Sequence, residues 1–452
     1  MQKFPLLLLN IFTSILISSC GHQSQNIKID TNTKNVAGNF DVKRVQFKNG
    51  LKLLILKDTS SPTFAYQTWF NVGSRNEVIG KTGLAHLFEH MMFKGTKNYK
   101  EGEFDSTLEQ AGVEGENAFT SNDHTVYIQE LPKEHLDLII NLESDRMVNL
   151  IVNDQSFKTE REVVQNERRF RKENSAEGTL YQTMLETAFT DSPYHWPVIG
   201  YEQDLNMMNA QDARDFYEKF YSPDRATIVV VGDVNESEVI RKVEKAYGSL
   251  TAKNTPDGEI KKDQEQTAQR RKKVPLNIQS EKLWLAYKIP EASHPDTPTL
   301  EVIQGILTDG MNSRLNRSLV NAGIATSVSS GSFSLRDPGI FTFMADLQKG
   351  KSAGLAEGIF LREIEKLKTK LISTEELQGV KNLLRFHFYE KISTPKGKAH
   401  FLGEFETTYG NFEAGVELQK KIANTTPEQI QNVVKKYFNT KNMTVLTGVP
   451  KK

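Results

Sequence analysis

The chain of 452 residues contains a single cysteine, Cys20, and therefore cannot form a disulfide within itself. Because this cysteine lies near the start, the rest of the chain has no thiol for nucleophilic catalysis. The chain also lacks an excess of charge, since Lys plus Arg and Asp plus Glu each number 57. This balance gives no reason to expect a nucleic-acid partner.

Long apolar runs are absent except at the start of the chain. The run at 5–17 is too short to cross a bilayer and is typical of the core of a signal peptide. Residues 17–20 read Ile-Ser-Ser-Cys, like a bacterial lipobox. We therefore expect residues 1–19 to be a lipoprotein signal peptide and Cys20 to carry lipid. The chain would then be anchored in the bacterial cell envelope, on the periplasmic side of the outer membrane. The alternative is an ordinary cleaved signal beside a chance cysteine.

The length predicts two or three domains, because 452 residues exceed what one core usually holds. Residues 20–40 are polar and predict a flexible tether. Residues 251–281 have few apolar side chains and predict a solvated linker. We thus expect an N-terminal domain at 41–250 and a C-terminal domain at 282–452.

Periodicity predicts a regular alternation of strands and helices. An Asn-Gly pair at 49–50 predicts a hairpin within 42–58. Further strands are predicted at 63–72, 227–231, 284–289 and 340–344. Helices are predicted at 103–110, 133–149, 155–173, 178–189, 210–221, 236–247, 352–368, 374–390 and 427–438.

Residues 86–90 read His-Leu-Phe-Glu-His, and no proline interrupts their surroundings. On a helix, His86 and His90 lie about 40° apart, so both imidazoles can bind one metal ion. Glu89 lies about 60° to the other side of His86, where a carboxylate can take a proton from a metal-bound water. This order is that of the inverted zincin motif. The alternative is two helix histidines on one face by accident, so the motif needs a third ligand.

A third ligand is available in the helix predicted at 155–173. Glu160 and Glu167 are seven residues apart and share a face with two valines. Carboxylates on an apolar stripe need a partner, because an unpaired buried charge is very costly. A zinc ion would neutralise them. The alternative is an ordinary charged helix in which arginines pair with the glutamates.

The His-x-x-Glu-His motif, followed 77 positions after His90 by Glu167, resembles the pitrilysin/insulinase family of zinc peptidases. The mitochondrial processing peptidases belong to the same family. The resemblance implies that His86, His90 and Glu167 bind one zinc ion per chain. It implies that Glu89 is the catalytic base and that Glu160 supports the site. The expected activity is zinc-dependent endopeptidase cleavage of peptides or unfolded polypeptides.

The resemblance also implies an α+β fold with two related domains. Each would be a sheet with helices packed on one face, and the two would be arranged as a clamshell. In keeping with this, residues 219–230 align with 436–447 at an offset of 217. At that offset the three motif residues fall on Ile303, Ile306 and Leu307. The C-terminal domain is therefore expected to lack a metal site.

In the resembled family, a substrate peptide adds to an edge strand beside the zinc by backbone pairing. This implies that Asn117 and Ala118 bind substrate. The alternative for Asn117 is a simple turn or strand-end residue.

One departure from the family concerns an Arg/Tyr pair that members often need in the second half. The stretch that begins Ser313-Arg-Leu has Val320 and Thr326 at the expected Arg and Tyr positions. We therefore expect a paralogous partner to supply the pair in a hetero-oligomer, although a homodimer is also considered. The alternatives are a non-catalytic structural or peptide-binding subunit and a lipid-tethered ligand-binding protein with a coincidental motif.

Overall fold

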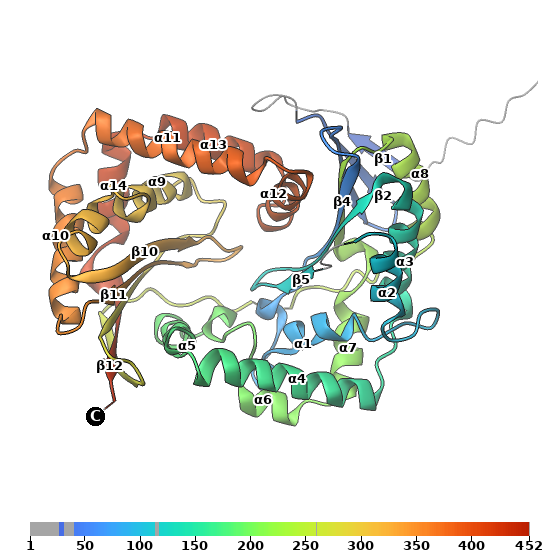
Figure 1. Ribbon diagram of the computed structural model, residues 1–452, viewed down its shortest axis with the longest axis horizontal. Helices are drawn as coiled ribbons and strands as arrows, with labels where there is room; N and C mark the ends of the chain where they lie inside the picture. Colours follow the sequence, from blue (N-terminus) through green and yellow to red (C-terminus); the bar gives the residue numbers. More distant parts are fainter. Residues whose placement is uncertain (1–26, 31–39, 114–116, 259, 452) are drawn as a thin grey trace, which may run out of the picture.

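The computed structural model describes residues 27–30, 40–113, 117–258 and 260–451 (Figure 1). The predicted signal peptide and Cys20 lie outside these residues. Within the predicted tether, β1 (Ile27–Asp30) pairs antiparallel with β2 (Val42–Phe47), so the tether prediction is wrong there. The alternation of isoleucine with polar residues in β1 is a strand pattern that composition alone concealed. No helix among the described residues is both long and apolar enough to cross a membrane.

The first half contains a seven-stranded sheet with the order β1-β2-β3-β7-β4-β6-β5. As predicted, the Asn-Gly turn at 49–50 joins β2 and β3 in an antiparallel hairpin. β5 is an edge strand, and among the described strands it pairs only with β6. The remaining strands are β3 (Lys52–Lys57), β4 (Thr63–Phe70), β5 (Asn117–Thr120), β6 (Thr125–Pro132) and β7 (Ala226–Gly232).

Helices of the first half pack on one face of this sheet, where side chains of α1, α3, α7 and α8 join one apolar core. The helices are α1 (Leu84–Met91), α2 (Glu103–Gln110), α3 (Leu136–Asn149), α4 (Asp154–Glu173), α5 (Ala176–Ala188), α6 (Glu202–Met207), α7 (Ala210–Phe220) and α8 (Glu236–Tyr247). Short turns of helix are η1 (Ser74–Asn76), η2 (Lys133–His135), η3 (Pro193–His195) and η4 (Pro223–Arg225).

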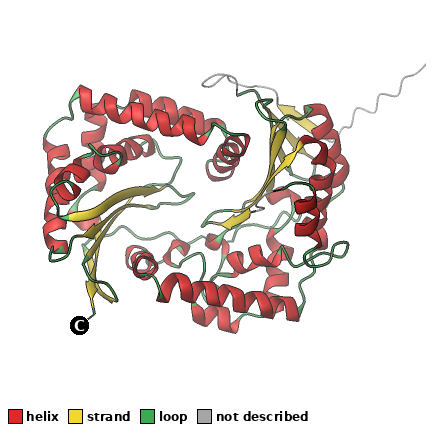
Figure 2. Ribbon diagram, viewed as in Figure 1, coloured by secondary structure: helices red, strands yellow, loops and turns green. Residues whose placement is uncertain are grey.

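The second half contains a five-stranded sheet with the order β10-β11-β9-β12-β8. Its strands are β8 (Arg270–Leu276), β9 (Lys282–Lys288), β10 (Ala325–Phe333), β11 (Ile340–Leu347) and β12 (Met443–Pro450). Its helices are α9 (Thr297–Thr308), α10 (Ala353–Thr369), α11 (Thr374–Lys391), α12 (Pro395–Thr408), α13 (Glu413–Asn424) and α14 (Pro427–Tyr437), with short helices η5 (Asn316–Val320) and η6 (Thr440–Asn442). The two halves lie side by side, each with its own sheet and helices, which confirms the predicted α+β fold (Figure 2).

The predicted helices and strands are all present, with their ends shifted by a few residues. The linker prediction is wrong at residues 270–276, which form β8 and pair parallel with β12. An edge strand with one wet face tolerates a run of arginine and lysine, which is why composition misled the prediction. No prediction covered α6, α9, α12, α13 or β10.

One helix of each half also packs on the sheet of the other half. α12 of the second half contacts β4 and β7 of the first sheet, and α5 of the first half contacts β8, β9 and β12 of the second sheet (Figure 1). The α12 side chains of Ala399, Phe401 and Leu402 share a core with Leu54, Trp69 and Val229 of the first sheet. The two helices lie at nearly the same offset that relates the halves in sequence. Part of the second face of each sheet is therefore covered by a helix of the opposite half.

Candidate metal centre

The helix α1 carries the motif residues and presents both histidines to one helix, α4. The two imidazole rings lie 4.9 Å apart between centroids, at an angle of 76°. Nε2 of His86 lies 3.7 Å from Oε2 of Glu167, and Nε2 of His90 lies 3.6 Å from the same oxygen. The structure thus brings together the three residues that the sequence proposed as ligands.

The donor set fits a zinc ion. One ligand atom from each of His86, His90 and Glu167 lies within 4.8 Å of the other two. Ligands about 2.0–2.1 Å from a tetrahedral ion lie roughly 3.4 Å from one another, close to the two distances observed. Oε2 of Glu167 is buried and has no hydrogen-bond partner among the described residues. Its other oxygen, Oε1, pairs with Arg171 Nη2 at 2.7 Å, which leaves Oε2 for a metal.

Glu160 lies one step further from the candidate ligands, as the resemblance implied. Nδ1 of His90 donates to Oε2 of Glu160 at 3.3 Å. Nζ of Lys94 pairs with Oε1 of the same carboxylate at 2.8 Å. A carboxylate on the outer nitrogen of a metal-binding imidazole fixes its tautomer and its orientation, so Glu160 holds Nε2 of His90 toward Glu167.

Glu89 is tied to the edge strand β5. Oγ1 of Thr120, the last residue of β5, donates to Oε2 of Glu89 at 2.6 Å. Asn117 is exposed at the start of the same strand, and Ala118 is partly buried. The candidate base and the candidate substrate strand are therefore joined by one hydrogen bond.

The electrostatics of the cluster suit a divalent cation. Burial and the adjacent His90 lower the pKa of His86, which favours a neutral imidazole. Against the effect of burial, the hydrogen bond to Glu160 and the nearby negative carboxylate of Glu167 raise the pKa of His90 to about 9. Burial raises the pKa of Glu89, as expected of a carboxylate that must hold a proton during a reaction. Despite burial, His90 and other cations nearby lower the pKa values of Glu160 and Glu167.

Sequence reasoning missed the residues that hold α1 in place. Gly83, with φ of +89°, precedes the helix, which has no side-chain cap of its own. Instead, the buried carboxylate of Glu77 accepts from the backbone N–H of Gly83 at 2.9 Å and of Ala85 at 2.8 Å. Nε1 of Trp196 donates to the same carboxylate at 3.0 Å. Glu77 would have been visible only as an acidic residue shortly before the helix, where a negative charge favours the N-terminus.

The stretch of the second half in which the family has an Arg/Tyr pair makes other contacts in this chain. Arg314 makes two 2.8 Å hydrogen bonds to the carboxylate of Glu376. Val320 ends η5, and Thr326, in the edge strand β10, donates through Oγ1 to the backbone oxygen of Asp346 at 3.1 Å. Residues 313–326 include no tyrosine, so this stretch lacks the Arg/Tyr pair expected of the family.

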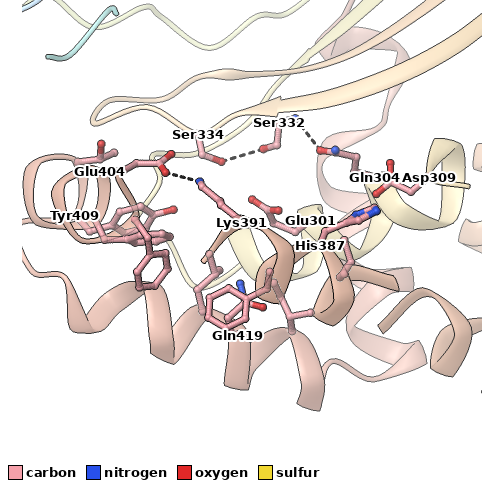
Figure 3. A pocket seen from close by; sticks show the side chains of 17 residues that line it. Glu301, Gln304, Asp309, Ser332, Ser334, His387, Lys391, Glu404, Tyr409 and Gln419 are labelled. Atoms are coloured by element: carbon pink, nitrogen blue, oxygen red, sulfur yellow. Dashed lines mark hydrogen bonds and ion pairs between the residues drawn. The ribbon is translucent and has the colours of Figure 1, made fainter. Parts of the chain in front are cut away.

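The second half contains a separate cavity of about 340 Å³ between α9, α11, α12 and α13 (Figure 3). Glu301, Asp309 and Glu404 line it, and Lys391 donates to Glu404 at 2.6 Å. None of its lining residues belongs to the candidate metal centre. It is thus distinct from the centre on α1 and α4.

Comparison with known proteins assigns both halves to one family. The model described as "Insulinase (Peptidase family M16)" matches residues 52–201. The model described as "Peptidase M16 inactive domain" matches residues 208–384. The first match contains all of the candidate metal-centre residues, and the second contains α9 and the predicted linker.

Individual relatives cover nearly the whole chain. The zinc protease PqqE of Helicobacter pylori is 30% identical over 407 residues, which are 89% of this chain and 91% of that protein. The uncharacterized zinc protease YmxG of Bacillus subtilis is 25% identical over 88% of this chain and 96% of its own length. The crystal structure of a protease from Helicobacter pylori superposes with a TM-score of 0.87 at 30% identity, covering 90% of this chain and 99% of that one. With two family models that together span more than half of its length, the chain belongs to the M16 (insulinase) family of peptidases.

Proposed function

We propose that the chain is a zinc-dependent endopeptidase that cleaves peptides or unfolded polypeptides. The observation that carries this proposal is the convergence of His86, His90 and Glu167 on one point, with the carboxylate of Glu89 on the same helix. The name "zinc protease" of the relatives from Helicobacter pylori and Bacillus subtilis supports the same chemistry.

The residues that would hold zinc are His86 and His90, through Nε2, and Glu167, through Oε2. A bound zinc ion supplies Lewis acidity, which lowers the pKa of a water and polarises the scissile carbonyl. The chain's part is to keep these three donors oriented. Glu160 does so for His90, and Arg171 does so for Glu167.

Glu89 is the proposed general base. Its partly desolvated carboxylate accepts a proton from the attacking water and later returns it to the nitrogen of the leaving amine. The hydrogen bond from Thr120 Oγ1 fixes one oxygen of Glu89 and leaves the other free for this transfer. Because Thr120 belongs to β5, a peptide added to this edge strand lies beside the base. Asn117 and Ala118 are the proposed backbone contacts, and such pairing makes cleavage tolerant of side chains.

The proposal is tested with the purified chain and a fluorogenic unstructured peptide. Glu89→Gln should retain about one zinc ion per chain and lose at least about a hundredfold in kcat. Glu167→Gln should lose both zinc and turnover, because a neutral amide is a poor replacement for a carboxylate ligand. The matched control is Glu162→Gln, an exposed position on the same helix, which should change neither. Peptide turnover that survives Glu89→Gln with zinc bound would refute the assignment of Glu89.

The chain lacks the family's Arg/Tyr pair. This favours a further proposal, which concerns the assembly in which the chain is active. With Val320 and Thr326 at those positions, we propose that a paralogous partner completes the site in a hetero-oligomer. The other candidate is a non-catalytic subunit that binds peptide for such a partner. High turnover by the purified chain alone would argue against both, whereas turnover only after a paralogue is added would support the first.

A further inference from the structure

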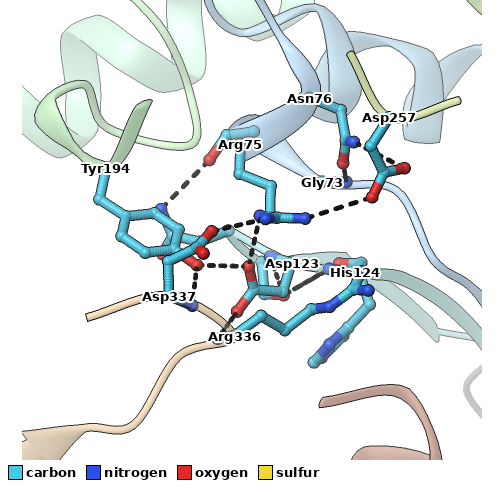
Figure 4. Close-up of polar contacts among 12 residues, drawn as sticks. Gly73, Arg75, Asn76, Asp123, His124, Tyr194, Asp257, Arg336 and Asp337 are labelled. Atoms are coloured by element: carbon cyan, nitrogen blue, oxygen red, sulfur yellow. Dashed lines mark hydrogen bonds and ion pairs between the residues drawn. The ribbon is translucent and has the colours of Figure 1, made fainter. Parts of the chain in front are cut away.

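A cluster of four charged side chains and one tyrosine joins the two halves beside the edge strand β5 (Figure 4). Arg75 in η1, Asp123 in the turn between β5 and β6, and Tyr194 in η3 come from the first half. Asp337 comes from the loop between β10 and β11 of the second half, and Asp257 from the segment that connects the halves. We refer to these five residues as the seam cluster.

Arg75 is the centre of the seam cluster. Its guanidinium contacts Asp337 Oδ2 at 2.5 Å, Asp123 Oδ1 at 3.4 Å and Asp257 Oδ2 at 3.5 Å. Arg75 is only 6% exposed and Asp123 only 3%. Buried charges persist where they are paired, so this arrangement depends on all of its members.

The backbone of the second half takes part as well. The N–H of Arg336 donates to Asp123 Oδ2 at 3.0 Å, and the N–H of Asp337 donates to the hydroxyl oxygen of Tyr194 at 3.2 Å. That hydroxyl in turn donates to Asp123 Oδ1 at 2.7 Å. Residues 336–337 are therefore fixed to the turn of the β5–β6 hairpin by backbone as well as side-chain contacts.

The seam cluster reaches the candidate base through β5. The N–H of Ser74 donates to Ser121 O at 3.2 Å, and the N–H of Arg75 donates to Asn122 O at 2.9 Å, so η1 is bound directly to the hairpin turn. The residue before Ser121 is Thr120, which donates to Glu89. At Gly73 a Cβ atom would lie 2.5 Å from Asn122 O, so the two segments approach as closely as a glycine permits.

We infer that Asp337 and Arg75 are positioning residues through which the second half fixes the substrate-binding edge strand β5 relative to Glu89. This inference rests on the proposed function, because it assigns β5 the role of substrate strand. It gives the second half, which has no metal ligands among its described residues, a direct part in peptide binding. The effect should appear in KM, because a displaced edge strand pairs poorly with the peptide while zinc and Glu89 stay in place.

A purely structural role predicts something different, namely that any ion pair between the halves has the same effect. The chain offers a matched control in Asp58, which pairs with Lys398 of α12 at 2.5 Å across the same two halves. The Asp58 side chain is 12% exposed and that of Asp337 is 18% exposed. Asp58 lies just beyond β3, whereas Asp337 lies against the β5–β6 turn.

The test compares Asp337→Asn, Asp337→Glu and Asp58→Asn in the full-length chain, with the same unstructured peptide. Asp337→Asn should raise KM about tenfold, with kcat changed less than about twofold and zinc content unchanged. Asp337→Glu restores the charge and should recover part of the loss, and Asp58→Asn should leave KM unchanged. An equal rise in KM for Asp58→Asn, or no rise for Asp337→Asn, overturns the inference.

Hydrogen exchange provides a second measurement that needs no catalysis. In Asp337→Asn, the amides of residues 117–120 should exchange faster while those of α1 keep their protection. Unchanged exchange in β5 overturns the inference. If the unmodified chain cleaves no peptide either alone or with a paralogue added, the proposed function fails, but the exchange experiment still decides whether the seam cluster holds β5.

Discussion

The helices α1 and α9 occupy corresponding places in the two halves, and they differ in the polar side chains that they carry. At the sequence offset that relates the halves, His86, Glu89 and His90 correspond to Ile303, Ile306 and Leu307. The latter three are almost fully buried on α9 and belong to the main apolar core. The first half therefore keeps three polar side chains where its counterpart packs hydrocarbon, and it must satisfy each of them with a partner.

The difference between α1 and α9 is seen in the side chains that contact α1. Glu160, Glu167 and Thr120 contact the three motif residues, and Glu77 holds the start of the helix. The three aliphatic residues of α9 pack in the apolar core instead and need no such partners. Polar side chains in a protein interior are costly unless they are hydrogen-bonded or bound to an ion, so the set on α1 indicates selection for chemistry over packing.

The largest expected effect comes from replacing a motif residue of α1 by its counterpart on α9. His90→Leu places the second half's residue at the first half's position and removes one of the three donors. Zinc content should fall from about one ion per chain to essentially none, and peptide turnover should be lost. The fold should persist, because leucine is well accommodated at the corresponding site. Zinc analysis and thermal unfolding check this, and a variant that retains a full zinc ion would contradict the ligand assignment.

A second comparison, between a glycine of α12 and a glycine of α11, has an intermediate expected effect. At Gly403 in α12, a Cβ atom would lie 2.2 Å from the Trp69 indole of the first sheet, whereas at Gly379 in α11 no atom lies within 4 Å. Gly403→Ala should destabilise the chain by about 1–3 kcal/mol through overpacking. Gly379→Ala should stabilise it by about 0.5–1 kcal/mol, because alanine favours helix. Denaturant unfolding distinguishes the two, and equal effects would show that α12 does not pack closely on the first sheet.

The smallest expected effect concerns Glu301 in the second half. Its carboxylate is less well paired than those of Glu160 and Glu167 on α4. Burial and the neighbouring Glu404 raise the pKa of Glu301 to about 7. A raised pKa means that the folded state prefers the protonated form, so stability is lost as the pH rises from about 4.5 through 7. Glu301→Gln should therefore raise Tm by about 2–4 °C at pH 8 and change it little at pH 4.5. An equal shift at both values would show that Glu301 does not titrate with folding.

The elements that sequence alone could predict are those with strong local periodicity. The helix at 155–173 and the motif at 86–90 repeat every three or four residues, and both were found within one or two residues of their ends. The seven-residue spacing also placed Glu160 and Glu167 on one face. These features depend only on neighbours along the chain, which is why a single sequence contains them.

The elements that could not be predicted depend on distant packing. Composition predicted that 270–276 is linker, because the exposed face of an edge strand looks like solvated coil. The cap on α1 from Glu77 and the brace on Glu89 from Thr120 join segments whose proximity no local pattern reveals. The exchange of α5 and α12 is of the same kind, since nothing within either helix says which sheet it will cover.

That exchange has a consequence for how the chain can be divided. Cut between its halves, the first fragment would lack α12 and present Leu54, Trp69 and Val229 to water as one continuous apolar surface. The second fragment would lack α5 and do the same with Trp284 and Leu446. Surfaces of that kind drive aggregation, so neither fragment is a self-sufficient folding unit. The boundary that sequence suggests as a place to separate two domains is thus a place where this protein cannot be taken apart.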